Sequence, residues 1–140
     1  LTYIVLLLII LFIEAATVII VYSFMSRLQA VFEGVMMQLV IGYYEDADYQ
    51  LLMDTMQAQW KCCGVTKPSD YERNEYFATS AAEFGVVDAG GVPSSCCTPD
   101  YFNTTVGINT ACGQGTRLKN AGPSHIYHDG CIGELFRAIY

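Results

Sequence analysis

The apolar run at the start of the chain is the feature that most constrains its fold. Between Leu1 and Met25 the single charged side chain is Glu14, and the first basic residue is Arg27. A helix of about 20 mostly apolar residues crosses the hydrocarbon core of a membrane. A secretory signal has a shorter apolar region between basic residues and a small-residue cleavage site, and this run has neither flank. We therefore expect a transmembrane helix over residues 1–26, with a fully buried helix of a soluble protein as the alternative.

The rest of the chain has the composition of an extracellular or lumenal segment. Residues 28–140 hold all 6 cysteines, 13 of the 14 acidic residues and 6 of the 7 basic residues, a net charge of −7. An acidic segment beside a membrane is disfavoured on the cytoplasmic face. Dense, even-numbered cysteines indicate disulfides, which need an oxidising compartment. We expect residues 28–140 to lie outside the cell or in a lumen, with residue 1 near the cytoplasmic side; the start inside an apolar run suggests a fragment.

Helical periodicity continues beyond the apolar run. Apolar residues at a three-to-four spacing predict a continuing helix whose face carries Leu28, Phe32, Val35, Leu39 and Tyr43. A second, shorter helix is predicted with Leu52, Met53, Met56 and Trp60 on its apolar face. Together they predict an antiparallel helical hairpin over residues 27–61. Neither face is buried by the hairpin alone, so the cysteine-bearing remainder must pack on it.

The remainder is broken into short pieces by glycine and proline. Residues 62–131 contain Pro68, Gly90-Gly91, Pro99 and further glycines, which predict turns. One short helix fits between Asp70 and Phe84, with Asp70 as its cap. Residues 132–140 become apolar and helical again, and we expect them to return toward the membrane.

The cysteines form an ordered set of motifs. They occur in Cys62-Cys63-Gly64, in Pro93-Ser94-Ser95-Cys96-Cys97, as Cys112, and in Gly130-Cys131. Six cysteines allow fifteen pairings, and spacing alone does not select one, although adjacent cysteines rarely bridge. The order of these motifs downstream of a span resembles the tetraspanin family over essentially the whole chain. The resemblance rests on the Cys-Cys-Gly triplet, the Pro-x-Ser-Cys motif, the final Gly-Cys, and the acidic-aromatic step at Ser69-Asp70-Tyr71.

The resemblance implies a fold and a disulfide pairing. The fold class would be all-α: the third transmembrane helix of four, continuing into a mainly helical, disulfide-stapled large extracellular loop over residues 27–140. The implied bridges are Cys62–Cys131, Cys63–Cys96 and Cys97–Cys112. Two further spans and a small loop would precede Leu1, and a fourth span would follow Tyr140.

Several residues are candidates for function. Glu14 is an expensive group in mid-span, so we expect it to make a polar contact within a helix bundle, or to be protonated in a packed interface. Asn103-Thr104-Thr105 is a sequon, which makes Asn103 a glycosylation candidate. The resemblance implies that the variable part of the loop recognises partners, and aromatic anchors suit such binding. The candidates there, each of which alternatively packs on the hairpin, are Phe84, Val86, Val87, Tyr101, Phe102, Ile108 and Tyr127.

Other chemistries have little support in the sequence. His125 and His128 lack the Cys-x-x-Cys spacing of zinc sites, and no nucleophile elbow, His-Glu-x-x-His motif or phosphate loop is present. We therefore expect neither catalysis nor a cofactor, a small-molecule substrate or a nucleic-acid partner. Four methionines, Met36, Met37, Met53 and Met56, recur at helical spacing, which favours core packing over an adaptable binding surface.

The resemblance to tetraspanins implies a non-enzymatic membrane scaffold. It would bind partner membrane proteins laterally, including other tetraspanins, contact membrane lipid, and organise partners in microdomains of the plasma or endosomal membrane as a multi-pass glycoprotein. The alternatives are a single-pass, disulfide-rich receptor or adhesion ectodomain, and a specialised structural tetraspanin. A membrane enzyme is a third class, and no feature of the sequence favours it.

Overall fold

The computed structural model describes residues 1–105, 107–119, 121 and 125–139. The chain forms two compact units, Leu1–Phe32 and Glu33–Tyr140. The expected fold class is confirmed: the chain is mainly helical, with a long apolar helix at its start, three disulfides and a single two-stranded sheet in the part of the chain that the structure describes.

The long helix α1 spans Thr2–Ile41, 40 residues, and its apolar window has a mean hydropathy of 3.2. Within the described residues it is the one helix long and apolar enough to cross a membrane. A helix of 40 residues is about 60 Å long, about twice the thickness of the hydrocarbon core. The hydroxyls of Thr17 and Ser23 donate to the carbonyls of Ile13 and Ile19, which satisfies these polar groups within the helix itself.

The last turns of α1 bury a different face from the one predicted. Leu39 and the following Tyr43 are buried as expected, but Leu28, Phe32 and Val35 are exposed. Buried α1 side chains gather instead near its end, and they are Met36, Leu39 and Val40. The ring contacts with Tyr71 and Phe77 are made by Tyr43 and Tyr44, which follow α1, so burial is found at this end of the helix.

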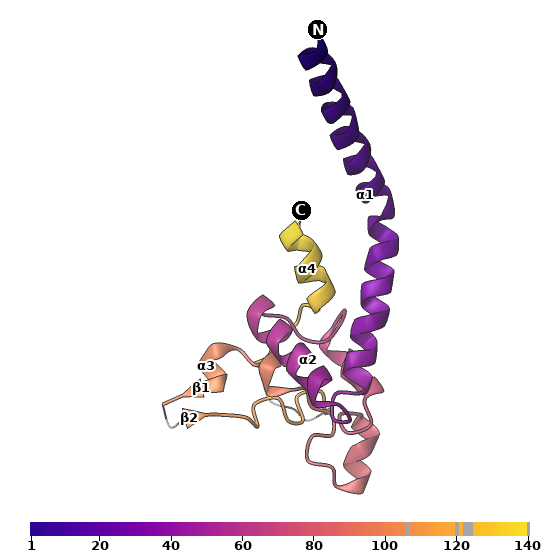
Figure 1. Cartoon of the computed structure of the whole chain (residues 1–140). Helices are drawn as coiled ribbons and strands as arrows, with labels where there is room; N and C mark the ends of the chain where they lie inside the picture. Colours follow the sequence, from indigo (N-terminus) through magenta and orange to yellow (C-terminus); the bar gives the residue numbers. More distant parts are fainter. Residues whose placement is uncertain (106, 120, 122–124, 140) are drawn as a thin grey trace. The chain divides into compact units, whose positions relative to one another are not determined.

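Helix α2 spans Ala47–Trp60 and has well-defined ends. The side chain of Asp46 caps its start by accepting from the backbone N–H of Asp48 at 2.8 Å. Lys61, in the left-handed conformation, ends it. Of the predicted apolar face, Met53 is buried and Leu52 is half exposed, whereas Gln57 is fully buried. Its main contacts are with η3 (Ser94–Cys96) and α4 (Cys131–Ile139), so the cysteine-bearing segments bury this helix (Figure 1).

The prediction of a single short helix between Asp70 and Phe84 is wrong. Two 3-10 helices take its place, η1 over Pro68–Arg73 and η2 over Thr79–Phe84. Asn74 separates them, because its amide donates to the carbonyls of Val40 and Ile41 at 3.0 and 2.9 Å and its oxygen accepts from the chain that follows. A side chain committed in this way holds the backbone out of a continuous helix.

The core of the second unit is aromatic. The rings of Tyr43, Tyr71 and Phe77 meet edge to face, with centroids between 5.1 and 6.1 Å apart. Tyr44 stacks on Phe77 at 5.2 Å. Tyr71 and Phe77 are almost completely buried, so this cluster fastens η1 and the segment before η2 to the residues that follow α1.

Three disulfides join the remaining segments. They are Cys62–Cys131, Cys63–Cys96 and Cys97–Cys112, the same pairing that the resemblance implies. The first is reinforced by backbone bonds from Cys131 to Gly64 and from Cys63 to Asp129. Gly64 has φ +73°, and a Cβ there would overlap the carbonyl of Lys67, which explains the glycine of the triplet.

Short elements complete the unit. Helix α3 spans Pro99–Phe102, and the strands β1 (Asn103–Thr104) and β2 (Gly107–Ile108) pair antiparallel, with Asn103 opposite Ile108. Helix α4 over Cys131–Ile139 confirms the helical turn expected at the end of the chain.

Candidate partner-binding surface

The predicted recognition residues fall into two groups. Phe84 and Val87 are 84% and 72% exposed at the end of η2, and Val86 beside them is half-buried. The second group surrounds α3 and the strands, where Ile108 is 67% and Tyr101 is 41% exposed. The η2 segment and the α3–β2 segment lie apart from one another (Figure 1), so the structure does not bring all the candidates into one site.

The first group, which we call the η2 patch (residues 84–87), is an apolar protrusion. Gly85 in the left-handed conformation ends η2 and directs the chain away from it. Beside the patch is an open cavity of about 300 Å³ lined by Ala78, Ala81, Phe84 and other residues. An exposed phenylalanine next to a cavity is an arrangement that suits contact with another apolar surface.

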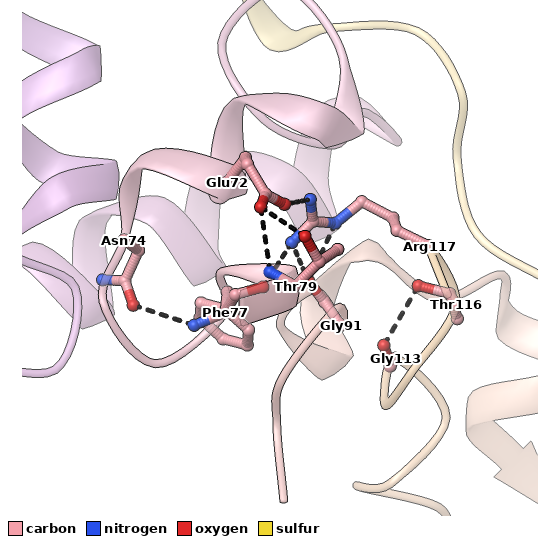
Figure 2. A network of polar contacts seen from close by, with 8 residues as sticks. All are labelled: Glu72, Asn74, Phe77, Thr79, Gly91, Gly113, Thr116 and Arg117. Carbon is pink, nitrogen blue, oxygen red and sulfur yellow. Dashed lines mark hydrogen bonds and ion pairs between the residues drawn. The ribbon is translucent and has the colours of Figure 1, made fainter. Parts of the chain in front are cut away.

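A polar clamp holds the chain around η2 in place (Figure 2). The guanidinium of Arg117 lies 2.7 Å from the carboxylate of Glu72 and donates to the carbonyls of Phe77 at 2.6 Å and Gly91 at 3.1 Å. Burial opposes the charge on Glu72, but hydrogen bonds from Thr79 and the Arg117 guanidinium outweigh it and lower the pKa of that carboxyl. The clamp ties the segment after Cys112 to η1 and η2.

The second group surrounds a groove between α2, η3 and α3, which we call the α2–α3 groove. Its volume is about 340 Å³, and its lining is mainly apolar. The lining residues are Asp54, Ala58, Ser94, Ser95, Cys97, Pro99, Phe102 and Tyr127. Of the predicted recognition residues, Phe102 and Tyr127 line the groove. Tyr101 instead stacks on His125, with centroids 4.2 Å apart and rings nearly parallel.

Disulfides and backbone bonds make the far wall of the groove rigid. The N–H of Tyr127 donates to the carbonyl of Cys96, and the N–H of Thr98 donates to the carbonyl of His125, both at 2.9 Å. Cys96 and Cys97 are each bonded to another segment. Burial, and then the charge of Asp100, raise the pKa of the Tyr127 phenol. The groove is therefore pre-formed in the free chain.

Polar residues that the sequence did not single out connect the lining of the groove to the buried core. The hydroxyl of Tyr43 donates to Oδ1 of Asp54 at 2.7 Å, and the hydroxyl of Ser95 lies 2.7 Å from both Asp54 Oδ1 and Gln57 Oε1. Gln57 also bonds the hydroxyl of Tyr71 at 2.8 Å. Burial, and then the negative charge of Asp54, raise the pKa of Tyr43. This network ties the Pro-x-Ser-Cys motif to α2. The sequence gives one indication of this network: Gln57 is a polar residue four positions after Met53, on the predicted apolar face of the helix.

The remaining candidates are placed as follows. Glu14 is exposed on α1. Asn103 begins β1, and its side chain lies outside what the structure describes. His128 is exposed. Met36 and Met53 are buried, and Met37 and Met56 are half-buried, which supports the core-packing interpretation.

Comparison with known proteins gives the family. The family model described as the tetraspanin family matches residues 1–140. This chain belongs to the tetraspanin family. Tetraspanin-12 of Caenorhabditis elegans is 35% identical over 128 residues, covering 81% of this chain and 41% of that protein. Tetraspanin-14 of Mus musculus is 35% identical over 135 residues, covering 92% and 49%. The chain thus spans less than half the length of these two relatives. It is a tetraspanin membrane protein with a disulfide-bonded loop and, within the residues that the structure describes, one candidate span.

Proposed function

We propose that this tetraspanin is a membrane scaffold that binds partner membrane proteins laterally and organises them in microdomains of the plasma or endosomal membrane. Residues 28–140 would be extracellular or lumenal in a multi-pass, non-enzymatic protein, in contact with lipid and with other tetraspanins. The observation that carries the proposal is the contrast within the second unit: a disulfide-bonded aromatic core supports exposed apolar side chains at Phe84, Val87 and Ile108. Exposed apolar groups on a fixed frame are typical of a binding surface.

The span and the loop would contribute differently. An ionised carboxylate facing lipid is costly, so Glu14 would face a neighbouring helix, and the small side chains of Ala15, Ala16 and Thr17 would allow that helix to approach closely. Such packing is compatible with many partners. Selection among them would come from the η2 patch and from the side chains around the α2–α3 groove.

Photo-crosslinking in cells tests the proposal. A photoreactive amino acid is placed at position 84, 87, 101 or 108 of the full-length protein, and cross-linked products are identified by mass spectrometry. We expect partner membrane proteins to be captured from these positions and not from the exposed position 51 on α2, which lies outside both surfaces. Capture of membrane proteins from position 51 alone, or from no position, would contradict the proposal.

A further inference from the structure

The α2–α3 groove has an acidic side chain, Asp54, within a mainly apolar lining. Asp54 and Ala58, one helical turn apart on α2, both line it, so a carboxylate lies beside an apolar channel. Oδ1 of Asp54 accepts from Tyr43 and Ser95. Among the described residues, no side chain or backbone group donates to Oδ2, and no basic side chain forms an ion pair with Asp54.

The polar side chains that line the groove are one carboxylate and three hydroxyls. Apart from Asp54 they belong to Ser94, Ser95 and Tyr127, and no basic residue lines the groove in the part of the chain that the structure describes. The charge of Asp100 acts on Tyr127 and so lies close to the same groove. A ligand that binds Asp54 gains most if it brings hydrogen-bond donors and positive charge.

The apolar part of the lining indicates which kind of cationic group fits the groove. Phe102 and Tyr127 place two aromatic side chains on the groove. A guanidinium is planar, stacks on aromatic faces, is more weakly hydrated than an ammonium and can donate to Oδ2 of Asp54, and the three-carbon stem of an arginine side chain packs on apolar walls.

We propose that the α2–α3 groove binds an arginine side chain from the extracellular or lumenal segment of a partner membrane protein, with the guanidinium on Asp54 and the stem against Phe102 and Tyr127. The proposal rests on the proposed function for the origin of the ligand, and it adds the chemistry that selects it. The wall bonded to Cys96 and Cys97 holds the groove open in the free chain, so little ordering is needed on binding.

The test uses acetyl-arginine-amide as the probe and the full-length protein in nanodiscs. The methyl group of Ala58, which lines the groove, reports binding by NMR, and the methyl of Ala82, which is exposed and outside the groove, is the internal control. We expect a saturable shift of the Ala58 signal in the millimolar range and none at Ala82. Acetyl-citrulline-amide, which has the same shape without the charge, should bind at least tenfold more weakly.

Variants separate the charge from the fold. Asp54→Asn keeps an oxygen for Tyr43 and should remove the preference for arginine over citrulline. Phe102→Ala should weaken arginine severalfold with Asp54 intact, which keeps the test decisive if Asp54→Asn lowers the melting temperature. Asp88→Asn is the matched control, because Asp88 also accepts a tyrosine hydroxyl, that of Tyr44 at 2.7 Å, but lies outside the groove; it should bind arginine as the parent does.

Four results would overturn the inference: no saturable shift at Ala58, equal binding of citrulline, equal binding of acetyl-lysine-amide, or unchanged discrimination in Asp54→Asn. Each would leave the scaffold proposal intact if cross-linking captures partner membrane proteins. Conversely, arginine binding without any cross-linked partner would support arginine binding in the groove and contradict the scaffold proposal.

Discussion

Asn74 joins the end of α1 to the turn between η1 and η2 through four hydrogen bonds: two from its amide nitrogen to Val40 and Ile41, and two to its oxygen from Tyr76 and Phe77. It is almost completely buried. Removing the Asn74 side chain would leave its buried hydrogen-bond partners without partners and out of contact with water. The loss in stability then exceeds the net contribution of the hydrogen bonds themselves.

Asn74→Ala should therefore lower the free energy of unfolding by about 2–4 kcal/mol. Asn109→Ala is the control, since the side chain of Asn109 accepts a single bond, from the N–H of Ala111 at 3.2 Å, and should cost under about 1 kcal/mol. Chemical unfolding followed by circular dichroism measures both. Equal losses would show that Asn74 does not hold the turn between η1 and η2 to the end of α1.

Substitution by alanine should lower the stability of the protein at one glycine and raise it at another. At Gly64 an added Cβ meets the carbonyl of Lys67 at a positive φ, so Gly64→Ala should destabilise by about 1–3 kcal/mol. Gly34 lies within α1 with nothing near its missing Cβ, so Gly34→Ala should stabilise by about 0.5–1 kcal/mol. The melting temperatures of the two variants measure both effects. A rise for Gly64→Ala would contradict the close packing at the triplet, and a fall for Gly34→Ala would contradict the open space around that position.

Among the elements, η1 and η2 depend on an ion pair that pH can remove. The pKa of Glu72 is lowered in the folded chain, so its contribution to stability is present at neutral pH and is lost as pH falls through that lowered value, below the usual range of a glutamate. Glu72→Gln should lower the melting temperature at pH 7, and the difference from the parent should shrink toward pH 3. A difference that stays constant with pH would mean that the Arg117 clamp does not act through charge.

How far the sequence predicts these elements depends on the range of the contacts that form them. Periodicity alone predicts α1 and α2, because their pattern repeats over many turns. The cysteine motifs, through the family resemblance, imply the disulfide pairing that the structure has. The break at Asn74 and the clamp at Arg117 were not predicted, because both depend on partners more than 25 residues away in the chain. For the same reason Asp54 was not singled out, although Phe102 and Tyr127 on the opposite wall of the groove were.

At the scale of the whole molecule, an extracellular or lumenal position of the acidic, disulfide-bonded segment predicts that it is glycosylated in cells. Asn103 begins β1 in the stretch between α3 and β2, within the sequon Asn103-Thr104-Thr105. Expression in a glycosylating cell should give a band that a glycosidase shifts, and Asn103→Gln should abolish the shift. A shift that survives the substitution would reject the site, and no shift in the parent would remove the support that glycosylation gives to the topology.

The central claim is that this tetraspanin presents recognition surfaces on a core that does not depend on them. The most direct measurement is partner co-purification in mild detergent for two alanine pairs, Phe84→Ala with Val87→Ala and Tyr101→Ala with Ile108→Ala, alongside surface expression and melting temperature. Leu51→Ala, an exposed apolar residue outside both surfaces, is the control. The account predicts that at least one pair weakens a partner by about tenfold, equivalent to about 1.4 kcal/mol, with expression and melting temperature unchanged. Partner binding that survives both pairs, or is lost only when the melting temperature falls with it, would contradict the account.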